Sequence, residues 1–98
     1  MIEKLKMIIK SHGAEGQKVK AVEELSELQV AILNDVNKGL NCRSNIVEEI
    51  ADVMVMIEQL KIIYEIPDPV IEFAMNEKID REIRRIERKK WIDENLKG

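Results

Sequence analysis

Two acidic pairs with the same separation limit how this chain can fold. Glu24 and Glu27 are three residues apart, as are Glu49 and Asp52, and both segments have helical periodicity. Residues three apart share a helix face, so antiparallel packing of the two helices would bring four carboxylates together. Two such charges about 5 Å apart repel by roughly 3 kcal/mol at an effective dielectric constant of about 20. We therefore expect a cation between them.

Periodicity and helix-breaking residues predict two helices in the first part of the chain. The first lies near residues 2–11 and stops at Gly13, because glycine suits a left-handed helix cap. The second runs from about residue 15 to residue 38, and Gly39 is its expected terminator.

Two further helices are predicted from cap signals. Asn45, followed three residues later by Glu48, is expected to cap a third helix that runs until Pro67 stops it. Asp68 as a cap and Pro69 at the first helical position open a fourth helix. The sequence therefore predicts an all-α, four-helix bundle.

Size and composition favour a single domain. A chain of 98 residues with 45% hydrophobic side chains can bury one modest core, so we expect one domain over residues 1–98. Only three aromatic residues are present, so Leu, Ile, Val, Met and Ala must fill that core. This composition is typical of packed helices.

Charge and cysteine content exclude several classes of protein. A net charge of -3 argues against a whole-molecule nucleic-acid binder, although the charge is unevenly spread and the C-terminal quarter differs from the rest. Cys42 is the only cysteine, so it cannot form an intrachain disulfide, and no apolar run is long enough to cross a bilayer. No secretory signal opens the chain, and we expect a cytoplasmic protein without membrane contact.

Helical projection places the acids beside the predicted core. On the second helix the expected inward stripe consists of Ala21, Leu25, Leu28, Ile32 and Val36. The stripe at the core edge consists of Gln17, Lys20, Glu24, Glu27 and Ala31. The third helix is apolar on two sides, with Glu49 and Asp52 in a narrow gap between them. Because one small bundle cannot cover both sides, we expect a homodimer or a higher homo-oligomer.

The acidic pairs predict a metal site for hard cations. Pairs of this kind are also common on solvated helix faces, but the repeated spacing and the apolar surroundings favour metal binding. Carboxylate oxygens suit Mg²⁺ or Mn²⁺, and Mg²⁺ is preferred. A di-iron site would need Glu-x-x-His motifs, and the only histidine, His12, lies outside both acidic pairs.

Basic residues on the fourth helix are candidates for phosphate binding. Lys78, Arg81, Arg85 and Arg88 follow one another at spacings of three, four and three residues. Magnesium held by carboxylates usually binds phosphate chains, and these Lys and Arg side chains could contact the same phosphates. A solvated charged face explains them equally well.

The acidic segments resemble the signature of MazG-like all-α nucleotide pyrophosphohydrolases. The residues that carry the resemblance are Glu23-Glu24-Leu25-Ser26-Glu27 and, after a gap of 21 residues, Glu49-Ile50-Ala51-Asp52. The resemblance implies that Glu24, Glu27, Glu49 and Asp52 are catalytic metal ligands. It also implies a hydrolase that converts a nucleoside triphosphate to the monophosphate and pyrophosphate.

Substrate contacts are implied less completely by the resemblance. Family members often carry Lys, then Asn four residues on, then Arg three further; Lys78 and Arg85 fit, but Glu82 replaces the Asn. The resemblance therefore implies Lys78 and Arg85 as phosphate ligands, and Arg81 is a further candidate because it lies on the same basic stripe. Gln17, on the face of Glu24, is a candidate for contact with the base or ribose. Either Glu23 or Glu27 could orient the attacking water.

A different class of function remains open on sequence alone. The chain could be a non-catalytic helical interaction module whose basic C-terminal helix docks on an acidic partner or nucleic acid. Trp91 beside Lys89 and Lys90 would suit such a role.

Overall fold

The computed structural model describes residues 1–38 and 43–96, and these residues are helical apart from short connections. The helices are α1 (Ile2–His12), α2 (Ala14–Lys38), α3 (Arg43–Ile63) and α4 (Asp68–Leu96). The prediction of an all-α fold is confirmed for this part of the chain, which contains no strand. None of the described helices has an apolar stretch suited to spanning a lipid bilayer.

The described helices stop at the predicted breakers Gly13 and before Pro67, but both predicted N-caps lie inside their helices, since α4 already includes Asp68. Gly13 ends α1 with a φ of 84°, and its backbone N–H donates a hydrogen bond to the carbonyl of Ile9. The cap predicted at Asn45 is wrong, because α3 already begins at Arg43. A cap contributes only about 1 kcal/mol, so added helical hydrogen bonds can outweigh it. The terminator predicted at Gly39 lies outside the described residues.

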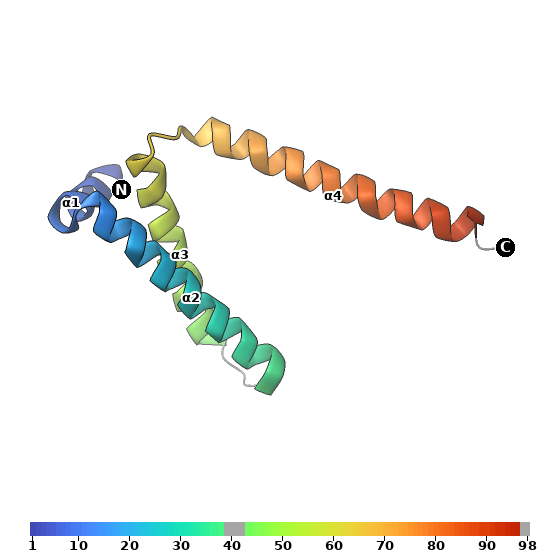
Figure 1. Ribbon diagram of the computed structural model, residues 1–98, viewed down its shortest axis with the longest axis horizontal. Helices are drawn as coiled ribbons and strands as arrows, with labels where there is room; N and C mark the ends of the chain where they lie inside the picture. The colour runs from blue at the N-terminus through green and yellow to red at the C-terminus, as the bar shows by residue number, and fades with distance from the viewer. Residues whose placement is uncertain (39–42, 97–98) are drawn as a thin grey trace. The chain divides into compact units, whose positions relative to one another are not determined.

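The chain divides into two units, Met1–Glu65 and Ile66–Gly98. In the first unit α2 and α3 lie side by side in opposite directions, and α1 packs against both (Figure 1). The second unit contains α4, and none of its described residues is buried. The first unit therefore holds the buried side chains and the acidic pairs.

The buried side chains of the first unit are partly polar. The apolar ones are Leu5, Ala21, Ala31, Val53 and Met56, and the polar ones are Gln17, Glu24 and Gln59. The inward stripe predicted for α2 is therefore wrong in part, since Leu25 and Ile32 are each 45% exposed and Val36 is 71% exposed. Instead α2 packs on α3 through the stripe that carries its acids.

Two glutamine side chains join α2 and α3 at one end of this contact. The amide nitrogen of Gln17 donates a 2.7 Å hydrogen bond to the amide oxygen of Gln59. The Gln59 nitrogen lies 3.6 Å from the sulfur of Met56. Gln59 is only 2% exposed, so the bond to Gln17 satisfies a polar group that water cannot reach.

Replacement of one glutamine of this pair should lower the free energy of unfolding more than replacement of both. We expect Gln59→Leu to lower the free energy of unfolding by about 1–3 kcal/mol, because the Gln17 amide stays buried without its partner. Gln17→Leu with Gln59→Leu should recover much of this loss. Urea unfolding with chelator at one protein concentration measures both effects. A double variant as unstable as the sum of the single variants would contradict a coupled amide pair.

Candidate metal centre

The antiparallel contact of α2 and α3 sets the residues of the site opposite one another. Gln17 meets Gln59 through the hydrogen bond described above, and Glu24 lies near Asp52. Further along, Ala31 and Asn45 line the same groove. Along α2 these residues are seven apart: Gln17, Glu24 and Ala31. Their partners on α3 are also seven apart, in the opposite direction: Gln59, Asp52 and Asn45. A single register therefore aligns the amide pair, the acids and the groove.

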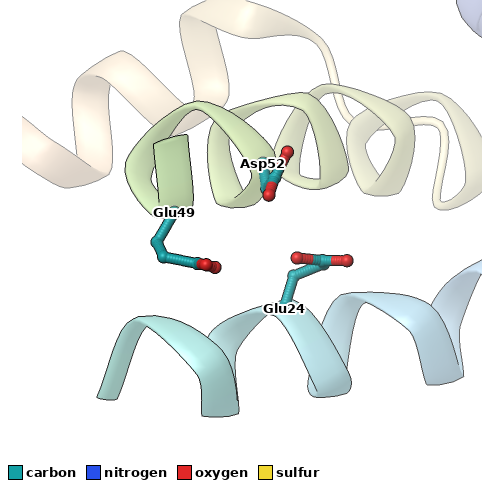
Figure 2. Close-up of side chains that lie close together, drawn as sticks. All are labelled: Glu24, Glu49 and Asp52. Atoms are coloured by element: carbon teal, nitrogen blue, oxygen red, sulfur yellow. The ribbon is translucent and has the colours of Figure 1, made fainter. Parts of the chain in front are cut away.

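Three of the four predicted metal ligands come together in the first unit. Glu24 projects from α2, and Glu49 and Asp52 project from α3, with their carboxylates in the space between the helices (Figure 2). One oxygen from each residue lies within 4.8 Å of the others. Adjacent ligands on an octahedral Mg²⁺ ion lie about 3 Å apart and opposite ligands about 4.2 Å apart, so the three oxygens would have to move closer together to share one ion.

Two oxygens of this cluster are buried without a hydrogen-bond partner. They are Oε2 of Glu24 and Oε2 of Glu49. Glu24 as a whole is only 7% exposed, whereas Asp52 remains open to solvent. A buried carboxylate oxygen without a donor or cation is costly, so this arrangement fits a bound cation. Hard oxygen donors also match the chemistry that Mg²⁺ and Mn²⁺ prefer.

Glu27 lies beside the cluster of three acids and faces the groove that begins there. Its side chain is exposed. Repulsion by the Glu24 carboxylate raises the pKa of Glu27 above the usual value of 4.5, and Glu49 adds to the effect. Glu27 is therefore close enough to respond to the charge of the cluster, as the spacing of the pairs predicts.

Lys20 is a site residue that the sequence analysis placed on the acidic stripe without a role. Its Nζ lies 3.1 Å from Oε1 of Glu24 and 3.8 Å from Oε2 of Glu23. The hydrogen bond and the attraction to Glu24 raise the pKa of Lys20 above its usual value. The spacing of four residues between Lys20 and Glu24 was the sequence signal for this pair.

The predicted substrate-binding residues lie in two different places. Gln17 is buried at the contact of α2 with α3, where it binds Gln59. Lys78, Arg81 and Arg85 lie on α4 in the second unit and are exposed. Arg85 pairs with Glu82 of the same helix at 3.5 Å. Their contact with substrate stays a prediction.

A groove of about 320 Å³ adjoins the acids on the first unit. Its lining comes from both helices and consists of Ser26, Glu27, Val30, Ala31, Asn34, Asn45 and Glu49. The sequence analysis assigned no site role to Asn34 or Asn45. The signal was their helical spacing, since Asn34 is seven residues after Glu27 and Asn45 is four before Glu49.

Comparisons with protein-family models, with curated proteins and with solved structures found no match to this chain. The resemblance to MazG-like pyrophosphohydrolases therefore stays a prediction based on the two acidic segments.

The raised pKa of Glu27 predicts how pH affects the metal-free protein. The folded state binds the Glu27 proton more tightly than the unfolded chain does. The contribution to stability is therefore complete below the usual value of 4.5 and is lost as pH rises through the raised pKa. We expect the melting temperature of Glu27→Gln to exceed that of wild type, by a margin that grows as pH rises from 4 to about 7.

Thermal unfolding with chelator, at low and high salt, measures this difference. Salt should reduce it, because Glu27 is exposed and its repulsion is screened. Glu48→Gln is the matched control, since Glu48 is exposed on α3 and lies outside both the acid cluster and the groove. An advantage of Glu27→Gln that does not depend on pH would contradict the repulsion.

Proposed function

We propose that this protein hydrolyses a nucleoside triphosphate to the monophosphate and pyrophosphate with the help of Mg²⁺. The observation that carries the proposal is the Glu24 carboxylate, which has a buried oxygen without a partner and lies against the carboxylates of Glu49 and Asp52. The resemblance of the two acidic segments to MazG-like pyrophosphohydrolases supports the same reaction. Mn²⁺ is expected to substitute, because it accepts the same hard oxygen ligands.

Electrostatics supports a metal as part of the site. Lys20 approaches only Glu24 among the three clustered acids, so one ion pair does not balance Glu49 and Asp52. A divalent ion between the carboxylates would neutralise this excess negative charge and satisfy the buried oxygens. Stability and function would then depend on the same ion, because the metal-free site is repulsive.

The chemistry divides between the metal and the side chains of the chain. When bound, Mg²⁺ neutralises phosphate charge and lowers the pKa of a coordinated water. Glu24, Glu49 and Asp52 hold the ion. Glu27, which is exposed beside them, orients the water that attacks the phosphorus and accepts its proton.

Cations are needed for the phosphate chain that leaves as pyrophosphate. Lys20 lies at the acid cluster and can exchange its contact with Glu24 for a phosphate oxygen once a metal neutralises that carboxylate. Lys78, Arg81 and Arg85 of α4 are proposed as further phosphate ligands. This role agrees with their exposure, which leaves their donors accessible.

We also propose that the chain forms a homodimer or a higher homo-oligomer. On α2, Leu25, Ile32 and Val36 are exposed because the helix packs through its polar stripe. On α4, Ile79, Ile83 and Ile86 are each about half exposed. Apolar stripes on both units favour burial against another copy.

Removal of one metal ligand should abolish turnover while preserving the fold. We expect Glu49→Gln to lower Mg²⁺-dependent release of pyrophosphate by at least about 100-fold, since even outer-shell changes at metal sites cost 10–100-fold. The same variant should lose the thermal stabilisation that Mg²⁺ gives to wild type. Circular dichroism should remain helical.

Glu48→Gln is again the matched control, because it removes a neighbouring charge from the exposed side of α3. It should retain both turnover and stabilisation by Mg²⁺. A wild-type protein that neither binds Mg²⁺ nor releases pyrophosphate from any nucleotide would contradict the proposed enzyme. Salt-sensitive binding of nucleic acid would then favour the docking module.

Assembly should depend on the exposed apolar stripe of α2. Sedimentation equilibrium of wild type should give at least the mass of a dimer at micromolar concentration. We expect Ile32→Glu to shift the protein towards monomer, because it places a charge in the buried contact. Asn37→Glu adds the same charge at an exposed position on a different face of α2 and should not. A wild-type monomer throughout this range would contradict the proposal.

A further inference from the structure

The groove beside the acids has the composition of a site for a neutral, polar ligand. One end is formed by Glu27 and Glu49, and the other end by Asn34 and Asn45. No Lys or Arg is among the described residues that line it. Carboxylates without a compensating cation disfavour a phosphate group at this place. At the asparagine end, away from the carboxylates, a ligand can bind through neutral hydrogen bonds and apolar contact.

The two asparagines are available for such hydrogen bonds. Neither side-chain amide bonds to another residue in the described part of the chain, although Asn34 is half-buried. A carboxamide offers both donors and an acceptor, as the edge of a nucleobase or a ribose does. Val30 and Ala31 add apolar surface between the amides and the acids.

The order of groups along α2 gives a direction to the site. Lys20 comes first, then Glu24 and Glu27, and then Asn34. The Lys20 cation therefore lies on one side of the carboxylates, and the asparagine end of the groove lies on the other. At a rise of about 1.5 Å per residue, Lys20 and Asn34 are roughly 20 Å apart along the helix. An extended ligand with one anionic end and one neutral end matches this order.

We propose that the groove is the nucleoside subsite and that Asn34 and Asn45 select the base or sugar through hydrogen bonds. This assignment rests on the function proposed above. The nucleoside occupies the groove, the α-phosphate lies at the acids, and the departing phosphates lie towards Lys20. A volume of about 320 Å³ is at the lower end of small-molecule pockets, so the groove holds the base with part of the sugar.

Leucine substitutions test the subsite, because Leu is close to Asn in size and cannot form hydrogen bonds. The variants are Asn34→Leu, Asn45→Leu and the control Asn37→Leu, whose parent residue is exposed on α2 outside the groove. Steady-state hydrolysis is measured with Mg²⁺ for the common ribonucleoside and deoxyribonucleoside triphosphates. Inhibition by inorganic pyrophosphate and Mn²⁺ binding without nucleotide are measured in parallel.

The groove variants should lose selectivity while the metal site stays intact. We expect kcat/KM for the preferred nucleotide to fall roughly five- to tenfold for each lost hydrogen bond. The ratio between preferred and poor substrates should shrink by the same factor, because poor substrates lack that bond. Inhibition by pyrophosphate and affinity for Mn²⁺ should match wild type, and Asn37→Leu should match wild type throughout.

Each other outcome contradicts a defined part of the proposal. Equal losses on every nucleotide, with unchanged ratios, would overturn the subsite, and so would wild-type behaviour of both groove variants. A loss of Mn²⁺ affinity in these variants would show a structural effect on the acids and would also overturn it. A wild-type protein that binds Mn²⁺ but hydrolyses no nucleotide would overturn the proposed function and the subsite together.

Discussion

Burial of acidic side chains between α2 and α3 is the constraint on which the first unit depends. Glu24 is almost fully buried, and its carboxylate faces those of Glu49 and Asp52. This contact brings like charges together, and Lys20 offsets only part of the repulsion. Elsewhere along the same contact the hydrogen bond between Gln17 and Gln59 satisfies the polar groups from inside the protein. Among the acids, by contrast, one oxygen of Glu24 and one of Glu49 are buried without a hydrogen-bond partner. This is the physical reason for proposing a divalent cation.

The same packing accounts for the exposed apolar surface. Because α2 presents its polar stripe to α3, its apolar stripe of Leu25, Ile32 and Val36 remains open. Ala21 and Ala31 are the small residues that allow the two helices to approach. The choice of this face therefore brings the acids together and leaves the apolar stripe exposed. Catalysis and assembly are linked in the proposal through the orientation of one helix.

Sequence patterns predicted the helices well and the packing less well. Gly13, Pro67 and the Asp68-Pro69 pair act through local backbone geometry, which a sequence contains directly. The cap at Asn45 failed because a longer helix competes with it. Three of the four acids were brought together as expected, and Glu27 was placed beside them. Asn34 and Asn45 were not assigned to a site because they meet only across the contact of two helices. Lys20 pairs with Glu24 within α2, at a spacing that the sequence already contains.

The sequence by itself determined which residues are helical and which acids share a face, since both follow from a period of 3.6 residues. Only the tertiary structure decided which face of α2 meets α3 and in what register. The helical period fixes angles around one axis but does not specify the neighbouring helix. Two adjacent stripes of α2 were candidates for the interface, and hydrophobicity favoured Leu25 and Ile32. The paired helix instead covers Gln17, Ala21 and Glu24, with the Gln17–Gln59 hydrogen bond satisfying part of its polar surface.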